Sequence, residues 1–154
     1  LSLKPEVNTS HGVINQELER MGVSNPTIKD VSQAVIRIRQ SKLPDPKVLG
    51  NAGSFFKNPV ISMSHYQALQ SEFPDLPAYP IDESSVKLPA GWLIEQCGWK
   101  GKTVGACGVH SLQALVLVNH GGATGKEIYK LSEAIIETVF ERFQVPLERE
   151  VNIY

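Results

Sequence analysis

One serine of this chain stands in a setting suited to chemistry. Ser54 follows Gly53 and precedes Phe55 and Phe56. A glycine lets a ligand come close to the backbone, and two aromatic rings can exclude water from a neighbouring hydroxyl. The stretch GNAGS around it lacks both the GxGxxG spacing and the GKS/T ending of nucleotide loops. Ser54 is therefore a candidate for substrate binding or proton transfer, and the alternative is that it only satisfies a turn.

Two further combinations lack the residues that would complete them. Cys107 and His110 have the spacing of half a zinc site, but no second pair of ligands has a matching spacing. A hydrolase with Ser54 as nucleophile and His110 as base would need a Gly-x-Ser-x-Gly turn, whereas the chain has Gly-Ser-Phe-Phe. Neither a metal site nor a hydrolase is predicted.

Charged side chains offer a weaker signal. Glu148 and Glu150 are two residues apart, so on a strand they share a face and one of them could point into a cleft. Charged residues near a chain end are more often solvated, and the spacing leaves both interpretations open. Five lysines lie in loops and at element ends, where each one alone is most simply a surface charge: Lys42, Lys47, Lys57, Lys87 and Lys100.

Composition limits the classes of function. The 154 residues (16.9 kDa) are 42% hydrophobic and 20% charged, which is typical of a globular domain and excludes disorder of the whole chain. A net charge of −1 disfavours nucleic acid and anionic membranes as partners. The longest aliphatic run, 114–118, is far too short to cross a bilayer.

The chain start and the cysteines bear on whether the chain is a fragment and on its location in the cell. It begins without Met and without the features of a signal peptide, which predicts a fragment of a longer protein. Cys97 and Cys107 are too few for a disulfide scaffold and are expected to be buried or free thiols. A reducing, cytoplasmic location is predicted.

Few of the candidate residues lie in the first third of the chain. We expect a strand at 1–8, a polar connection through Gly12, and a helix over 27–41 that two prolines end. The segment 42–59 shows little periodicity, and long ordered loops of this kind often carry function. We place a boundary between two structural units in this segment.

The rest of the chain mixes helices and strands without a regular strand-helix-strand alternation. The expected elements are a helix over 63–72, a proline-rich extended loop over 73–80, a short helix near 92–97, a strand over 112–119, a long helix over 124–143 and a strand over 145–154. This pattern predicts an α+β fold, with helices packed on a small, mostly antiparallel sheet.

Four stretches resemble the UDP-N-acetylenolpyruvoylglucosamine reductase (MurB) family in order and spacing. They are 42–47 (KLPDPK), 50–59 (GNAGSFFKNP), 87–97 (KLPAGWLIEQC) and 147–151 (LEREV). The resemblance spans the whole chain but only the C-terminal half of the family, whose glycine-rich flavin loops lie upstream. It implies that residues 1–42 are the trailing part of the FAD-binding domain and 43–154 the substrate-binding domain.

The resemblance implies a reaction. The family reduces UDP-N-acetylglucosamine enolpyruvate to UDP-N-acetylmuramate for peptidoglycan, using FAD and NADPH. By resemblance Ser54 is the proton donor, and Glu150 assists charge stabilisation at the enol carboxylate. An arginine and a tyrosine of the same site belong to the missing flavin domain, so the isolated fragment is expected to be inactive. Where the family commonly has an arginine, this chain has Asn152, which puts one ligand contact in doubt.

The resemblance also implies a set of contacts to the nucleotide sugar. Ammonium groups suit a diphosphate, and an aromatic ring suits a nucleobase or sugar face. The implied substrate-binding residues are Lys42, Asn58, Tyr79, Lys87, Lys100 and Gln113. The missing flavin-binding half is the expected protein partner. The alternative from a different class is a stand-alone nucleotide-sugar binding module without redox activity.

Overall fold

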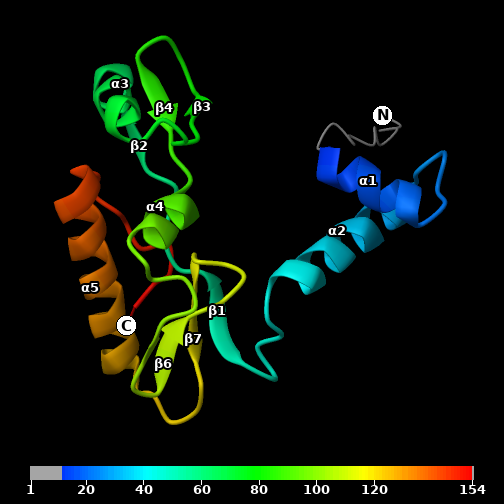
Figure 1. Ribbon diagram of the computed structural model, residues 1–154. Helices are drawn as coiled ribbons and strands as arrows, with labels where there is room; N and C mark the ends of the chain where they lie inside the picture. The colour runs from blue at the N-terminus through cyan, green and yellow to red at the C-terminus, as the bar shows by residue number, and fades with distance from the viewer. Residues whose placement is uncertain (1–11, 154) are drawn as a thin grey trace, which may run out of the picture. The chain divides into compact units, whose positions relative to one another are not determined.

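The computed structural model describes residues 12–153, and the chain divides into two compact units between Pro44 and Asp45 (Figure 1). We call the part up to Pro44 the first unit and the part from Asp45 the second unit. The sequence analysis places a boundary within 42–59. The assignment of the two parts to a flavin-binding and a substrate-binding domain stays a prediction.

The first unit contains a helix that the sequence analysis did not predict. α1 (Gly12–Arg20) replaces the expected polar connection. Gly22 lies just after the end of α1 and has φ of +72°. Its N–H donates to the carbonyl oxygen of Glu19 over 2.9 Å. Glycine adopts this left-handed geometry without strain. The expected strand at 1–8 lies outside the described residues.

The second helix of this unit, α2 (Ile28–Lys42), confirms the predicted helix. The Thr27 hydroxyl accepts a hydrogen bond from the Asp30 N–H, and the Asp30 carboxylate accepts one from the Thr27 N–H. Each bond satisfies a backbone or side-chain group at the open helix start. At the other end Leu43 turns extended while its N–H still donates to the Arg39 carbonyl. The prolines after it prevent continuation.

The second unit contains two small sheets in which every strand pair is antiparallel. The first sheet has the order β1-β7-β6-β5 and consists of β1 (Gly50–Ser54), β5 (Thr103–Val104), β6 (Cys107–Val109) and β7 (Val116–Asn119). The second sheet has the order β2-β4-β3 and consists of β2 (Val60–Ser62), β3 (Tyr79–Pro80) and β4 (Ser85–Lys87). Together with the helices these sheets confirm the predicted α+β fold.

Three helices belong to the second unit: α3 (Met63–Glu72), α4 (Ala90–Gln96) and α5 (Gly125–Phe143). The hydroxyl of Ser62 accepts a hydrogen bond from the His65 N–H at the start of α3. Thr124 and Glu127 form a reciprocal capping box at the start of α5. These local signals predicted α3 and α5 correctly. The short helix expected after Pro89 is confirmed as α4, for which Pro89 is the cap residue.

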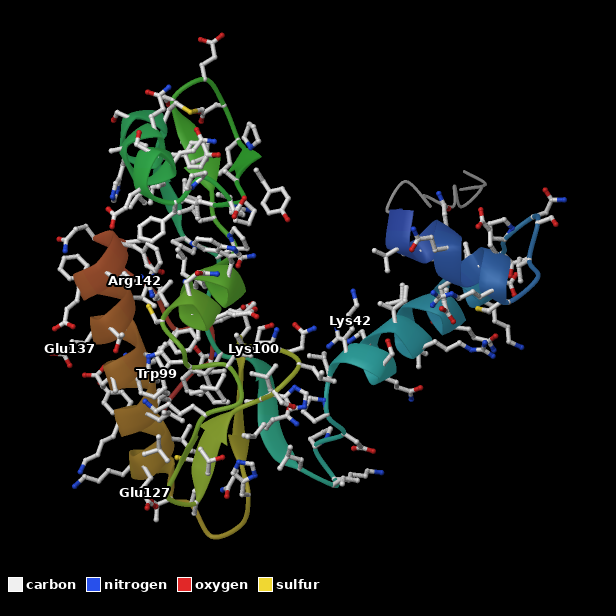
Figure 2. The ribbon with its side chains drawn as sticks, viewed as in Figure 1. Lys42, Trp99, Lys100, Glu127, Glu137 and Arg142 are labelled. Atoms are coloured by element: carbon white, nitrogen blue, oxygen red, sulfur yellow. The ribbon has the colours of Figure 1, made fainter. Side chains whose placement is uncertain are left out.

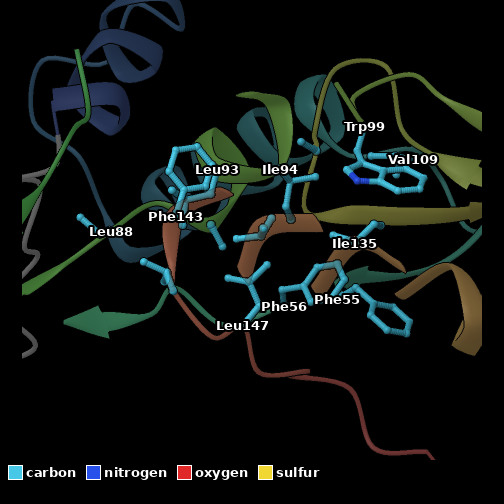
Figure 3. Packing of buried hydrophobic residues seen from close by; sticks show 14 of the residues in the cluster. Phe55, Phe56, Leu88, Leu93, Ile94, Trp99, Val109, Ile135, Phe143 and Leu147 are labelled. Carbon is cyan, nitrogen blue, oxygen red and sulfur yellow. The ribbon is translucent and has the colours of Figure 1, made fainter. Parts of the chain in front are cut away.

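The core of the second unit forms around one face of α5. Leu131, Ile135, Val139 and Phe143 recur every four residues, and none of them is more than 4% exposed. Figure 3 shows Ile135 and Phe143 in the same cluster as Phe56 and the buried residues of α4. Burial of each such side chain contributes about 1.5–3 kcal/mol to stability. This face anchors α5 against α4 and β6.

Two expectations for the middle of the chain need correction. The segment 42–59, expected to be irregular, contains β1, because Gly50 and Asn51 pair with Asn119 and Val118 of β7. Its sequence GNAGS has low strand propensity, so the pairing partner determines the strand. The predicted strand 112–119 is shortened to β7, which lies between β1 and β6.

The strand expected over 145–154 was wrong for the described residues. Residues 145–153 form no named strand, and their only ladder contact is an isolated bridge between Phe56 and Arg149. The prediction rested on the alternation of residues 150–153, but there Val151 is only half-buried and Ile153 is 52% exposed. The buried residues of this segment are Val145 and Leu147, at 0% and 5% exposure, which pack into the core. Alternation alone does not separate a strand from an extended segment lying over a core.

Candidate functional site

Ser54 lies at the end of β1 beside a local irregularity. The register of β1 against β7 shifts between Asn51 and Ser54. Gly53 has φ of +74°, and its N–H donates to the Asn51 side-chain oxygen over 3.0 Å. A glycine is favoured there because side chains strain this geometry. Ser54 follows this irregularity, and its side chain is exposed at the surface.

The two phenylalanines after Ser54 anchor it. Phe55 is 6% exposed and Phe56 is 1% exposed, and their ring centroids are 5.4 Å apart. The Phe55 N–H also donates to the Leu115 carbonyl oxygen over 2.7 Å. The rings are therefore buried beneath the serine and fix its backbone. Shielding of the Ser54 hydroxyl by these rings stays a prediction.

A short antiparallel contact joins this serine segment to the chain's C-terminal segment. The Glu150 N–H donates to the Phe55 carbonyl over 2.9 Å, and the Lys57 N–H donates to the Glu148 carbonyl over 2.9 Å. Phe56 and Arg149 form the bridge between these two bonds. The structure thereby brings the backbones of Ser54 and Glu150 close together. Convergence of their side chains on one substrate stays a prediction.

The two C-terminal glutamates differ in their partners. Glu148 Oε2 lies 3.0 Å from Lys57 Nζ, and both side chains are exposed. The Glu150 carboxylate is exposed as well, but it makes no hydrogen bond or ion pair with another residue of 12–153. Glu150 is therefore the carboxylate available to a ligand. Asn152, at the position where the family commonly has arginine, is also exposed.

Asn58 links the serine segment to α4. Its side-chain oxygen accepts a hydrogen bond of 2.9 Å from the Ala90 N–H, at the start of the helix. The cap residue itself, Pro89, offers no side-chain bond there, so Asn58 satisfies a backbone group that the helix leaves open. The NH₂ group of Asn58 remains as a donor toward phosphate or sugar oxygens.

Tyr79 and Lys87 lie directly opposite each other in the second sheet. Lys87 also pairs with Val60 on its other side, and the Leu88 N–H donates to the Pro59 carbonyl over 2.9 Å. Tyr79 is 60% exposed and Lys87 is exposed. Backbone hydrogen bonds therefore connect these two residues to Pro59 and β2, which follow Ser54 in the chain.

The remaining predicted contacts lie in other environments. Lys100, labelled in Figure 2, follows α4 in the chain. Its Nζ lies 2.8 Å from Glu95 Oε1, so its charge is already paired. Gln113 is half-buried in the turn before β7, where its carbonyl accepts from the Val116 N–H, and Val116 is the register partner of Ser54. Lys42 ends α2 in the first unit and lines a cavity of about 230 Å³ there.

The cysteines take no part in this constellation. Cys107 is buried and Cys97 half-buried, both are free, and burial raises the pKa of each thiol. The Cys107 thiol donates to the Val104 carbonyl over 3.4 Å, and His110 Nδ1 accepts from the Leu112 N–H. Among residues 12–153 no three His, Cys, Asp or Glu side chains are grouped to hold a metal ion.

A separate cavity of about 240 Å³ lies beside Trp99. It is lined mostly by apolar side chains from α5 and the β5–β6 region, and none of the predicted site residues lines it. The indole Nε1 of Trp99 has no hydrogen-bond partner within the described part of the chain and is out of reach of solvent. A ligand in the open part of this cavity would therefore not meet the indole N–H.

The structure contains one polar cluster that the sequence did not predict. Arg149 contacts Ser132 and Glu133 of α5, and its guanidinium lies over the Tyr129 ring. Ser132 is fully buried although it is polar. The signal was a serine on the apolar face of a predicted helix, where such a hydroxyl needs a partner.

Comparison with known proteins assigns the second unit to a family. The family model described as "UDP-N-acetylenolpyruvoylglucosamine reductase, C-terminal domain" matches residues 45–154. The chain belongs to the UDP-N-acetylenolpyruvoylglucosamine reductase family. The model begins at the first residue of the second unit.

Several relatives carry the name UDP-N-acetylenolpyruvoylglucosamine reductase. The chain is 56% identical to the Flavobacterium johnsoniae protein, over 96% of this chain and 44% of the relative. It is 56% identical to the Chromobacterium violaceum protein, over 97% and 44%. It is 51% identical to the Pseudomonas aeruginosa protein, over 100% and 45%. The chain thus spans less than half the length of these relatives.

Within residues 12–153 no helix combines the length and the apolar character that crossing a bilayer requires.

Proposed function

We propose that this chain is the substrate-binding C-terminal part of a cytoplasmic reductase that converts UDP-N-acetylglucosamine enolpyruvate to UDP-N-acetylmuramate for peptidoglycan. The observation that carries the proposal is the backbone pairing of 55–57 with 148–150, which brings Ser54 and Glu150 together. Family membership and the names of the relatives support the same substrate. The flavin-binding half of the same protein is the proposed partner.

The glycine-rich stretch of the described residues does not by itself fit a dinucleotide cofactor. Gly50 and Gly53 belong to the antiparallel strand β1, which leads to β2, whereas dinucleotide phosphates commonly rest on a glycine turn between a strand and a helix. We therefore assign the binding of FAD mainly to the upstream region of the whole reductase. In the whole reductase FAD, reduced by NADPH, supplies the hydride.

Ser54 is proposed to complete the reduction with a proton. Hydride addition to one carbon of the enolpyruvyl double bond leaves an electron pair on the neighbouring carbon, conjugated with the carboxylate. That carbon forms a new C–H bond as the Ser54 O–H bond breaks, and the serine regains its proton from water. A hydroxyl is a weak acid, but an enolate-like carbon is basic enough to accept its proton. The exposed position of Ser54 on a fixed backbone suits this role.

Glu150 is proposed to stabilise the charge that builds up on the substrate carboxylate. A hydrogen bond from its side chain to the developing enolate oxygen would spread this charge. Its side chain has no competing partner among residues 12–153. The neighbouring Glu148 is engaged with Lys57 and is left out of the mechanism.

The nucleotide part of the substrate is proposed to lie along the second sheet. Lys87 is exposed and makes no ion pair with another described residue, so its ammonium group suits a diphosphate. Tyr79 presents a ring beside it, and the Asn58 amide adds a donor. Gln113, Lys100 and Lys42 are proposed as further contacts, Lys100 with its charge already shared with Glu95.

The test compares the full-length reductase with this chain alone. Substrate-dependent oxidation of NADPH by the full-length protein, and none by the chain alone, is the expected result. If the full-length protein lacks this activity and the chain alone binds the UDP-sugar in a calorimetric titration, the alternative binding module is correct.

A further inference from the structure

We propose that Arg149 is a positioning residue that fixes Glu150 beside Ser54 by fastening the C-terminal segment to α5. The inference rests on the proposed function, since it assigns a task to the neighbour of the proposed catalytic glutamate. Its support is a set of contacts that converge on one side chain.

Arg149 makes three contacts with one face of α5. Its Nε donates to the Ser132 hydroxyl over 2.8 Å, and its Nη2 contacts the Glu133 carboxylate. Its guanidinium carbon lies 4.4 Å from the centre of the Tyr129 ring. The three partners are spaced i, i+3 and i+4, so they lie on adjoining turns of the same face. The Arg149 side chain is only 20% exposed as a result.

The Ser132 hydroxyl gives this contact a fixed direction. Ser132 is completely buried, and its hydroxyl donates to the Tyr129 carbonyl over 2.6 Å. The hydroxyl proton is therefore used in the bond to the helix backbone, and the hydroxyl oxygen accepts the bond from Arg149. A buried hydroxyl with both roles filled holds its partner in one geometry. An arginine fork, planar and always charged, suits this arrangement better than a flexible lysine.

The backbone around Arg149 offers little other support. Residues 148–150 are held to 55–57 by the two hydrogen bonds of one isolated bridge rather than by a continuous ladder. Along an extended segment consecutive side chains point to opposite sides. With Arg149 directed toward α5, Glu148 and Glu150 are directed away from it, and both are exposed. Fixing Arg149 therefore fixes the side on which the Glu150 carboxylate emerges.

The first test measures local order in this chain. Loss of a hydrogen bond to a charged group should raise local opening about 10- to 100-fold. In Arg149→Gln, hydrogen exchange of the Glu150 N–H should accelerate by that factor, while exchange in the middle of α5 stays unchanged. Lys57→Gln is the matched control, because it breaks an exposed ion pair of the same segment and should leave this exchange rate unaltered.

The second test is a double-mutant cycle in the full-length reductase. Arg149→Gln should lower kcat about 10- to 100-fold, the cost of misplacing a catalytic group, with KM for the UDP-sugar changed less than about threefold. Combined with Glu150→Ala it should cause no further loss, because both changes remove the same function. Arg149→Lys keeps the charge and should recover part of kcat, which also covers the case in which Arg149→Gln does not fold.

The outcomes separate this inference from the proposed function. Losses that add up in the double variant would show that Arg149 acts on general stability, and the inference would be wrong. It would be equally wrong if Glu150→Ala is impaired while both Arg149 variants retain wild-type kcat. If Glu150→Ala itself keeps full activity, the proposed role of Glu150 fails and the inference falls with it.

Discussion

The Glu150 N–H donates a 2.9 Å hydrogen bond to the carbonyl oxygen of Phe55. Since Phe55 directly follows Ser54, this bond ties the two proposed catalytic residues together although they are almost a hundred positions apart. The contact lies outside both sheets, and it depends on Phe55 and Phe56 being buried beneath it. The proximity of these two residues is thus a consequence of core packing at one point.

Replacing Ser54 by alanine tests the proton-donor role. In the full-length reductase Ser54→Ala should leave reduction of the flavin by NADPH nearly intact. Its reoxidation by the enolpyruvyl substrate should slow by about 10²- to 10⁴-fold, because only this half-reaction needs the proton. Stopped-flow absorbance of the flavin separates the two steps. Ser71→Ala, at the exposed end of α3, is the control. Equal losses in both steps would indicate that Ser54 is structural.

Replacing Lys87 or Tyr79 tests where the nucleotide binds. Because the two residues are cross-strand partners, Lys87→Ala and Tyr79→Ala should act on the same ligand. Each should raise KM for the UDP-sugar, by about tenfold or more for the lysine, and leave KM for NADPH nearly unchanged. Steady-state kinetics with each substrate varied in turn measures this. Lys126→Ala, an exposed lysine at the start of α5, should change neither constant. The reverse ranking would move the nucleotide to another surface.

Local signals in the sequence predicted local structure well. The capping pairs at Thr27 and Thr124 fixed the starts of α2 and α5, because the capping atoms are only three residues apart. β1 and the segment 148–150 could not be found in this way. Their conformations depend on partners far along the chain, and the sequence GNAGS shows no strand preference of its own.

The candidate site shows the same division. The pattern around Ser54 left both a turn residue and a functional residue open, and the family resemblance supplied the pairing with Glu150. The structure separates Glu148 from Glu150 through Lys57, which spacing alone could not do. Arg149 was missed although Ser132 lies on the apolar face of a predicted helix, because the sequence does not show which distant side chain bonds this buried hydroxyl.

The aromatic cluster at the end of α5 should dominate the stability of the second unit. Phe143 is fully buried, with its ring centroid 4.8 Å from that of Phe73 and 6.0 Å from that of Trp92. Phe143→Ala should lower the free energy of unfolding by about 3–5 kcal/mol. Phe140→Ala, on the same helix but 46% exposed, should cost far less and is the matched control. Urea unfolding followed by tryptophan fluorescence reports this unit, because both tryptophans lie in it. Equal costs for the two variants would contradict the packing described for α5.

The capping box of α5 should make stability depend on pH. The Thr124 backbone N–H, followed by the Thr124 hydroxyl, lowers the pKa of Glu127 below its ordinary value. A carboxyl with a lowered folded-state pKa stabilises the fold above its unfolded-state pKa, and this contribution is lost as pH falls through the folded-state value. Glu127→Gln should therefore reduce the drop in melting temperature between neutral and strongly acidic pH. Glu137, further along the same helix and exposed, bonds to neither helix end (Figure 2). Glu137→Gln should leave that drop unchanged, and identical pH profiles for the two variants would refute the role of Glu127 as a cap.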